Sequence, residues 1–361
     1  MINEGIPSRR DRSPFGIPDK PEPARERWTG TIFAFLSTFF FAISNVAVRY
    51  LAGEEIPLDW ILFFKESVGL LLLLPWLCLR FGQGRFRHTS RRLMIYVLLA
   101  AVLCQLFGAR LHVLGFAVIG LIIAVPLIQS STLLGVAVLG HFVLGDSLSR
   151  WRKISITILV VAITILSIGK GLLAAPPSEQ TVSASVFLLV AAGTIVAGLS
   201  YSVYIVMLRY IIRKYWKEEN STWHSFQFHR WIGHDFEKQT AKQLYSPFPV
   251  TLMMALVLSV GIVIFGTCLY GKHGITGFYN VPEIAWRCIL LSGICNAVGF
   301  FFQIQGLRMT SAVQASLIAV SQMILLSLIG HYFFAEAINL VVLLGLGLTF
   351  CGVVMSALPE K

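Results

Sequence analysis

The chain has 361 residues, of which 56% are hydrophobic and only 13% carry a charge. A soluble domain cannot bury that much apolar surface, so the composition excludes an ordinary soluble enzyme or binding module and indicates a protein surrounded by lipid. The six cysteines lie within or beside apolar segments and lack CxxC spacing, so we expect neither a metal site nor another cofactor.

The first 28 residues are polar, proline-rich and basic, without the apolar core of a signal peptide. We therefore interpret residues 1–28 as a cytoplasmic tail. The sequence after it predicts about ten transmembrane helices, each long enough to cross about 30 Å of hydrocarbon. Their predicted limits are Thr29–Leu51, Pro57–Leu79, Leu93–Val113, Phe116–Leu144, Ile154–Leu172, Ala184–Ile212, Pro249–Leu269, Ile284–Leu307, Ala312–Phe334 and Leu340–Leu358.

The net charge of +11 is unevenly placed along the chain. Most Lys and Arg residues fall in the tail and in the loops after every second predicted helix. The positive-inside rule then predicts that both termini are cytoplasmic, in the inner membrane if the source is bacterial. The basic balance is thus a sign of membrane topology, and nucleic acid is not an expected partner.

An internal repeat organises the sequence. Leu121–Ile168 aligns without a gap on Ser311–Leu358, so that GHFVLGD at Gly140–Asp146 falls on GHYFFAE at Gly330–Glu336. Each copy closes one apolar helix with a Gly-His, an aromatic residue and an acid before another apolar span begins. Repeats of this kind are typical of transporters built from two halves.

Ten helices divide into two halves of five, and because five is odd, the second half must cross the membrane in the opposite direction. The predicted fold is an all-α integral membrane protein with two inverted five-helix repeats, at 29–172 and 184–358. A long polar segment at about 213–246 is the predicted cytoplasmic insertion. Its aromatic and mixed-charge composition favours a helix on the membrane surface.

Three stretches together resemble a known family. FAISNVAVR, at Phe41–Arg49, places an aromatic-small pair before Ser-Asn in the first predicted helix. GLIIAVPLIQSSTLLGVAVLGHFVLGDSLS, at Gly120–Ser149, forms the fourth. In the second, Lys65 follows Pro57 by eight residues. These features resemble EamA-type members of the drug/metabolite transporter superfamily, although the family usually has an arginine where Lys65 stands.

The resemblance covers about Trp28–Leu358. It implies ten helices arranged as inverted repeats around a central cavity. It also implies the export or exchange of small metabolites without ATP.

Charged residues inside the predicted spans are the first candidates for function. Glu66 is the only carboxylate deep in any span, where a charge costs several kcal/mol unless it is paired or faces water. We expect Glu66 to bind a proton or a substrate amine and Lys65 to hold a substrate carboxylate; the alternative is a structural pair or an outward-reaching Lys65. Arg110 and His112, in the outer part of the third helix, either guide anions to the cavity or lie among lipid headgroups.

Polar side chains that can hydrogen-bond form a second candidate group. Such groups in lipid must find partners, either across helix interfaces or in a wet cavity, and their number favours a polar central cavity. The predicted substrate-binding or coupling residues, besides Lys65 and Glu66, are Asn45, Gln105, Gln129, Tyr201, Asn296, Gln303 and Gln322. Ser130, Thr132, Tyr204 and Gln314 belong to the same polar group.

His141 and His331 occupy equivalent places in the two repeats. A proton role is conceivable because histidine titrates near neutrality, but an interfacial place at a helix end is the favoured interpretation. We expect Asp146 and Glu336 to mark helix ends or to cap the next helix.

These features favour a non-enzymatic secondary transporter that moves amino acids, amines or related solutes by alternating access, with protons as the candidate coupling ion. The fifth and tenth helices, poor in polar residues, are the predicted scaffold. The alternatives are an exchanger of nucleotide sugars or sugar phosphates, an intramembrane enzyme acting on lipid-linked substrates, and a receptor or assembly factor. The expected partners are a small-molecule substrate and the lipid bilayer, and both a monomer and a homodimer stay open.

Overall fold

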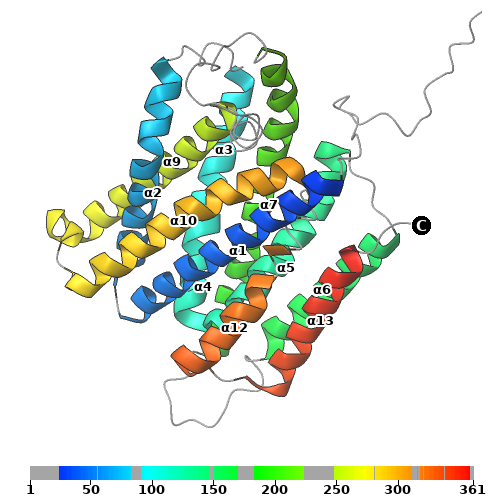
Figure 1. Ribbon diagram of the computed structural model, residues 1–361. Coiled ribbons are helices and arrows are strands. Elements are labelled where there is room, and N and C mark those ends of the chain that lie inside the picture. The colour runs from blue at the N-terminus through cyan, green and yellow to red at the C-terminus, as the bar shows by residue number, and fades with distance from the viewer. Residues whose placement is uncertain are drawn as a thin grey trace, which may run out of the picture.

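The computed structural model describes residues 24–54, 56–82, 91–145, 150–169, 183–222, 248–279, 281–310, 315, 318–319, 321–336 and 338–357. These residues form a bundle of long helices (Figure 1). The helices of the first half are α1 (Ala24–Gly53), α2 (Leu58–Gly82), α3 (Arg91–Leu103) continued by the π-helix η3 (Cys104–Ala109) and by α4 (Arg110–Ile119), α5 (Leu121–Leu139) continued by the π-helix η4 (Gly140–Leu144), and α6 (Arg150–Gly169). Those of the second half are α7 (Ala184–Thr222), α9 (Phe248–His273) with the short 3-10 helix η6 (Ile275–Phe278), α10 (Glu283–Met309), α12 (Ser321–Phe334) and α13 (Leu340–Ala357).

The described residues contain no strand, which confirms the predicted all-α fold. Six helical stretches are long and apolar enough to cross a membrane: Trp28–Gly53, Met94–Ile119, Leu121–Leu144, Ala184–Ile212, Val250–His273 and Glu283–Met309. Shorter apolar helices lie at Lys153–Leu166, Ser321–Phe334 and Leu340–Gly352. The exact number of crossings and the inversion of the two halves therefore stay predictions.

One predicted boundary was wrong. The third span was expected to end at Val113, but the helix continues to Ile119, and the break falls at Gly120. Gly120 has φ +77° and ψ 173°, a conformation that glycine adopts without a steric penalty and that β-branched or bulky residues avoid. The chain reverses direction at this residue, and α5 starts immediately afterwards.

Helix α7 also runs further than predicted. It extends to Thr222, so residues 213–222 of the predicted insertion continue a long helix. Residues 223–247, which hold the rest of the insertion, lie outside the described residues. So do residues 1–23 of the predicted tail, together with Asp146 and Gln314.

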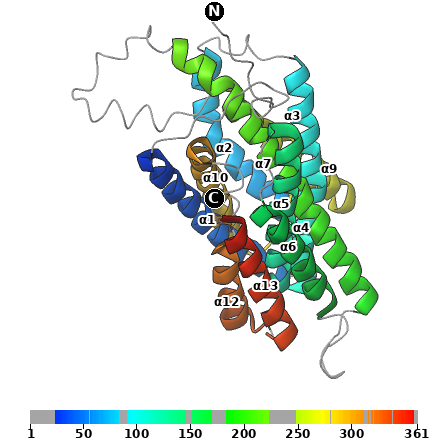
Figure 2. The same cartoon turned by 90° about the vertical axis from the view of Figure 1, so that its right-hand side faces the viewer.

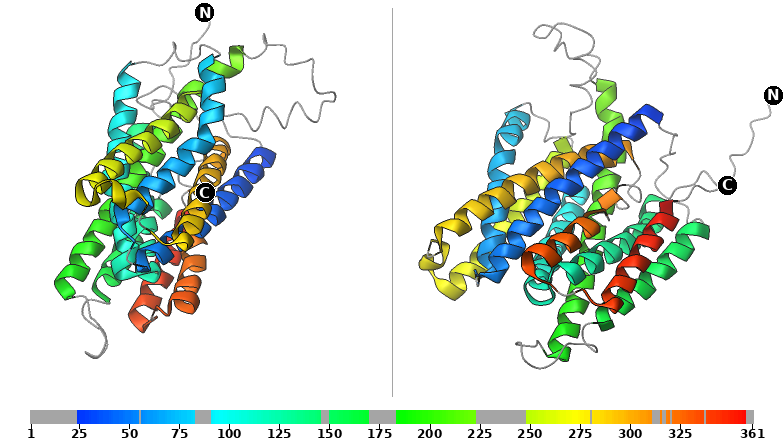
Figure 3. Two further views of the ribbon diagram at one scale, coloured as in Figure 1. Left: turned by 90° about the vertical axis from the view of Figure 1, so that its left-hand side faces the viewer. Right: turned by 60° about the horizontal axis from the view of Figure 1, so that its bottom comes forward.

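The helices pack in pairs that join the two halves of the chain. Helix α1 lies along α10 and α6 lies along α13, as Figures 1 and 3 show, and α2 packs on α9. The α6–α13 pair lies at the right-hand side of the bundle in Figure 1, the side that faces the viewer in Figure 2. Small residues line these seams: Gly306 of α10 lies against the backbone of Ala34, and Ser155 of α6 donates a hydrogen bond of 2.5 Å to the carbonyl of Gly352.

Helices α5 and α7 make the closest of these glycine contacts. Thr132 donates a hydrogen bond of 3.1 Å to the carbonyl oxygen of Gly198, and Ser131 contacts the same glycine. A Cβ atom added at Gly198 would lie 2.5 Å from the carbonyl oxygen of Ile128. The backbones can approach this closely only because residue 198 has no side chain.

We expect Gly198→Ala to lower the thermal unfolding temperature in detergent, because the added methyl group meets backbone that cannot move independently. Overpacking of this kind costs about 1–3 kcal/mol. The matched control is Gly347→Ala in α13, where an added Cβ meets no atom within 4 Å in the part of the chain that the structure describes. Equal melting temperatures for the two variants would contradict the tight α5–α7 seam.

Candidate functional site

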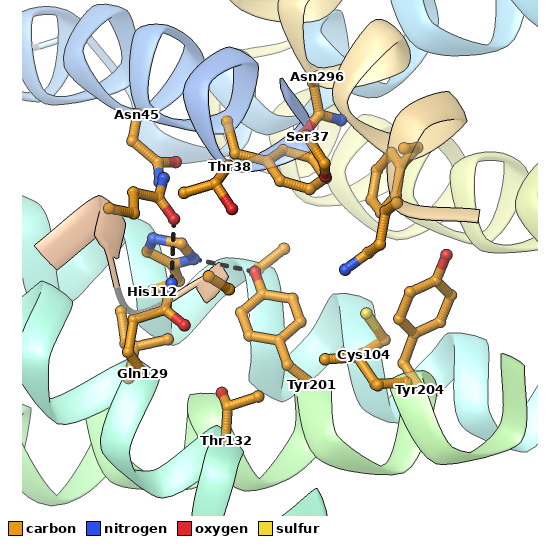
Figure 4. A pocket seen from close by; sticks show the side chains of 18 of the residues that line it. Ser37, Thr38, Asn45, Cys104, His112, Gln129, Thr132, Tyr201, Tyr204 and Asn296 are labelled. Carbon is orange, nitrogen blue, oxygen red and sulfur yellow. Dashed lines mark hydrogen bonds between the residues drawn. The ribbon is translucent and has the colours of Figure 1, made fainter. Parts of the chain in front are cut away.

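Within the bundle lies a cavity of about 150 Å³, lined by side chains from both halves of the chain (Figure 4). All nine residues proposed from the sequence line it: Asn45, Lys65, Glu66, Gln105, Gln129, Tyr201, Asn296, Gln303 and Gln322. The structure therefore brings them together, whereas their part in binding or coupling stays a prediction. Neither α6 nor α13 contributes to this lining, as expected of scaffold helices.

One wall of the cavity is built by α1 and α10. Ser37, Phe41 and Asn45 follow each other at intervals of four and lie on one face of α1. From α10, Asn296 and Gln303 lie seven residues apart, again on one face. Figure 4 shows Ser37, Asn45 and Asn296 on one side of the cavity, opposite residues of α5 and α7.

The charged pair of α2 lies at the edge of the cavity. Lys65 Nζ is 3.4 Å from Glu66 Oε1, and the two side chains are 13% and 4% exposed. Lys65 and Glu66 therefore form an ion pair with each other, although adjacent positions on a helix point in different directions. The pair stands in surroundings that exclude water, where removing one partner leaves the other charge uncompensated.

The π-helix η3 places Gln105 beside Glu66. In this stretch the backbone N–H of Arg110 donates to the carbonyl oxygen of Gln105, a bond that spans five residues instead of four. Gln105 Nε2 donates a hydrogen bond of 3.0 Å to the carbonyl oxygen of Val257 on α9. The nearby Gly261 makes room for both side chains, since an added Cβ would lie 2.9 Å from Gln105 Cδ and 3.0 Å from Glu66 Cγ.

Two further hydrogen bonds cross the cavity. His112 Nδ1 and the Tyr201 hydroxyl are 3.0 Å apart and join α4 to α7 (Figure 4). Gln129 Nε2 donates to Gln322 Oε1 at 3.0 Å, which joins α5 to α12 and hence the two halves. His112 thus lines the cavity, which does not fit a place among headgroups, whereas a part in guiding anions stays a prediction.

Several buried polar atoms in the lining have no hydrogen-bond partner within the described part of the chain. They include acceptors, at Glu66 and Gln105, and donors, at Asn296 and Gln322. A buried polar atom without a partner costs about 1–3 kcal/mol, and native proteins keep few of them. Their concentration in one cavity is what a site for a polar ligand requires.

Ion pairs lie beyond the cavity, at the end of the bundle where α1 ends and α2 begins. Asp59, which is buried, lies 3.3 Å from Arg110 Nη2 and 2.7 Å from Lys272 Nζ. Arg110 therefore takes part in an ion pair, and the two roles considered for it stay predictions. Glu336 follows the end of α12, as expected, but it caps α5, and the next helix, α13, is capped by Asn339.

The two repeat-related histidines lie at exposed helix ends. His141 stands in η4 and His331 in the last turn of α12, and both are exposed. His331 Nδ1 is 3.1 Å from the carbonyl oxygen of Glu336. Their positions match the interfacial interpretation, and neither lines the cavity.

Residues 238–358 match the model of the EamA-like transporter family. This confirms the family resemblance found in the sequence over residues 238–358, which lie within the second predicted repeat. Together with the apolar helices, the EamA match over residues 238–358 supports an integral, multi-pass membrane protein.

The fold of the whole chain is similar to that of a solved structure titled "Crystal structure of protein". The match has a TM-score of 0.52 and 14% sequence identity, and it covers 91% of this chain and 96% of the other. At that identity the similarity supports the fold alone. It extends over the first half as well, to which the EamA match does not reach. No curated protein matches the chain.

Sequence reasoning missed some lining residues. Ser37 and Thr38 contribute hydroxyl groups, and Phe41 and Phe300 form an aromatic contact with ring centroids 5.1 Å apart. The signal was present, because Ser37 and Phe41 precede Asn45 at helical spacing. Cys104 carried no signal, since a lone cysteine in an apolar helix is usually a packing residue.

A double-mutant cycle tests the pairing of Lys65 with Glu66. We expect Lys65→Met and Glu66→Gln each to lower stability in detergent, because each leaves one buried charge unpaired. The double variant should recover part of this loss, with a coupling free energy of about 1–3 kcal/mol. Denaturant or thermal unfolding measures it.

The control for this cycle is the exposed pair Arg287–Glu283, at 2.6 Å with side chains 74% and 79% exposed. Its cycle of Arg287→Met and Glu283→Gln should show little coupling, because solvent screens the charges. If the stability losses of Lys65→Met and Glu66→Gln simply add in the double variant, the two charges do not stabilise each other.

Proposed function

We propose that the chain is a secondary transporter that carries small polar metabolites, such as amino acids or amines, through this cavity by alternating access. One observation carries the proposal: buried polar atoms from both halves, without partners in the described structure, gather in a single cavity. A structural core would pair such atoms with each other or remove them. A transporter must leave them free for its substrate.

The chemistry of the lining supports a small substrate with both charges or with an ammonium group. Glu66 Oε2 and Gln105 Oε1 are acceptors for N–H groups. Lys65, Asn296 and Gln322 carry donors for a carboxylate or carbonyl group. The volume of about 150 Å³ is small beside the roughly 300–1,000 Å³ of sites for drug-sized ligands.

The helix pairing supports alternating access. Exchanging the two predicted repeats maps α2 onto α9 and α6 onto α13, which are partners in the bundle. It also maps the pair of α1 and α10 onto the pair of α7 and α4, which pack together as well. An arrangement of this kind suits two related halves that move against each other around a midplane site.

An exchanger of nucleotide sugars or sugar phosphates has less support. Phosphate recognition usually relies on several cationic side chains, above all arginine. Within the described lining, Lys65 is the one Lys or Arg, and Glu66 already pairs with it. The same lining includes Glu66, His112 and Cys104, but Glu66 pairs with Lys65 and His112 with Tyr201, so the described contacts do not join an acid, a histidine and the thiol as an enzyme would require.

The first test is the thermal stability of purified protein in detergent against a panel of amino acids, amines, nucleosides and sugar phosphates. A ligand at 100 times its dissociation constant adds about 2.7 kcal/mol to the stability of the folded state. We expect an amine or amino acid to raise the unfolding temperature. Uptake into proteoliposomes then measures transport directly. A shift with sugar phosphates alone would favour the exchanger.

Proton coupling is proposed to depend on Glu66. In proteoliposomes with an imposed pH gradient, wild-type protein should accumulate substrate against its concentration gradient. Glu66→Gln cannot bind or release a proton at this position, so we expect it only to equilibrate substrate, with rates that no longer depend on pH. If Glu66→Gln still accumulates substrate, coupling lies elsewhere.

The space at Gly261 provides a second test of the site. Gly261→Ala should displace Gln105 and Glu66 and weaken ligand binding about tenfold, corresponding to about 1.4 kcal/mol. Ligand-induced thermal shifts measure the change. Gly271→Ala is the matched control, because it lies in the same helix and its added Cβ meets no described atom within 4 Å. If Gly261→Ala binds the ligand with wild-type affinity, Glu66 and Gln105 are not part of the binding site.

A further inference from the structure

A second polar centre lies at the end of the bundle where α1 ends and α5 begins. The carboxylate of Glu336 accepts hydrogen bonds from the backbone N–H groups of Leu121 and Ile122, both at 2.9 Å. Arg49 Nε donates to the same carboxylate at 3.1 Å. Both carboxylate oxygens are thus bonded, and the negative charge lies at the positive end of the α5 dipole. We call Arg49, Glu336 and the first two residues of α5 the Glu336 latch.

The local backbone conformation directs the Glu336 side chain toward the start of α5. Ala335 has φ +52°, the left-handed conformation in which glycine is the usual residue. The backbone N–H of Glu336 then donates to the carbonyl oxygen of Gly330 at 3.1 Å, which closes the end of α12. Gly120 and Gly330 leave room for the carboxylate, since a Cβ at either would lie within 3 Å of it.

Arg49 is held equally firmly. Its guanidinium lies 5.3 Å from the centre of the Phe334 ring, in a cation–π contact, while it bonds to Glu336. The side chains of Arg49 and Glu336 are 17% and 9% exposed, so water screens their attraction little. The latch therefore joins α1 and the end of α12, through charge, to the start of α5.

The latch lies directly beyond the cavity. Asn45 lines the cavity one turn before Arg49 on α1, a rise of about 6 Å. Gln129 lines it seven residues after Ile122 on α5, about 10 Å away. Leu121, Ile122 and Ile123, at the start of α5, are buried. A solute entering or leaving at this end must pass between the elements that the latch holds together.

We propose that the Glu336 latch is the gate of the cavity at this end, closed in the present structure. The inference rests on the proposed transport function. Helices α1 and α10 form one packed pair and α5 and α7 another, and the latch connects the two pairs. Opening the gate separates Arg49 from Glu336 or Glu336 from the α5 amides. The positive-inside prediction places this end outside the cell.

Cys104 is a natural reporter of gate opening, because it lines the cavity and is buried. In protein where Cys104 is the sole cysteine, a membrane-impermeant, trimethylammonium-bearing methanethiosulfonate is added to each face of proteoliposomes in turn. We expect slow labelling of otherwise wild-type protein from the Glu336 face. Glu336→Gln should label about tenfold faster from that face, because it weakens the charge-assisted bonds and shifts the population toward the open state.

Two variants make this test specific. Arg49→Gln disturbs the latch from α1 and leaves the α5 cap in place, so faster labelling from the same face is expected again. Glu283→Gln is the matched control, because its carboxylate belongs to the exposed Arg287 pair at the start of α10. Glu336→Asp, one methylene shorter, serves if Glu336→Gln does not fold.

Labelling of the latch variants at the rate of Glu283→Gln would overturn the gate. An equal increase from both faces would mean a loosened bundle and would also contradict it. Ligand-dependent thermal shifts of the same proteins test the transport proposal separately. If no ligand binds, yet Glu336→Gln still opens the cavity from one face, the gate stands and the proposed function fails.

Discussion

Charge inside an apolar helix bundle is the constraint on which the rest of the structure depends. Without a partner, the charge of Glu66 would cost several kcal/mol in lipid, and the residues near it on α2 and its neighbours reduce this cost. Lys65 supplies the opposite charge at 3.4 Å. The π-helix η3 and Gly261 of α9 bring the amide of Gln105 next to it. One carboxylate thereby draws three helices to the same point at the edge of the cavity.

The seams between helices serve a different purpose. Lipid offers no hydrophobic force for helix association, so the pairs of this bundle rely on close backbone approach and short polar contacts. Ser44 and Ser292 hydroxyls meet at 2.9 Å between α1 and α10, and Ser155 bonds to Gly352 between α6 and α13. In each of these contacts, the serine hydroxyl has a hydrogen-bond partner on the neighbouring helix. Each contact joins a helix of the first half to a helix of the second half.

The sequence predicted the all-α fold, the EamA resemblance and the residues that meet in the cavity, because each depends on a local property. An amide or an acid within an apolar run can be recognised as a candidate site residue from the sequence alone, as with Asn45 and Glu66. The sequence could not supply contacts that depend on distant partners. It placed Glu336 at a helix end but could not reveal that its carboxylate reaches Leu121 and Ile122. Likewise, the π-helical geometry around Gln105 follows from packing, and propensity does not encode it.

Buried Glu66 and half-buried Glu336 are in opposite bonding states. Both oxygens of Glu336 are bonded, so this carboxylate has no capacity for a ligand while the latch is closed. Glu66 Oε2 has no partner within the described residues, so this carboxylate keeps its capacity open. A polar group that the protein satisfies by itself can hold two elements together. One that it leaves unsatisfied can still accept a hydrogen bond, and the proposed transport function assigns that place at Glu66 Oε2 to a ligand.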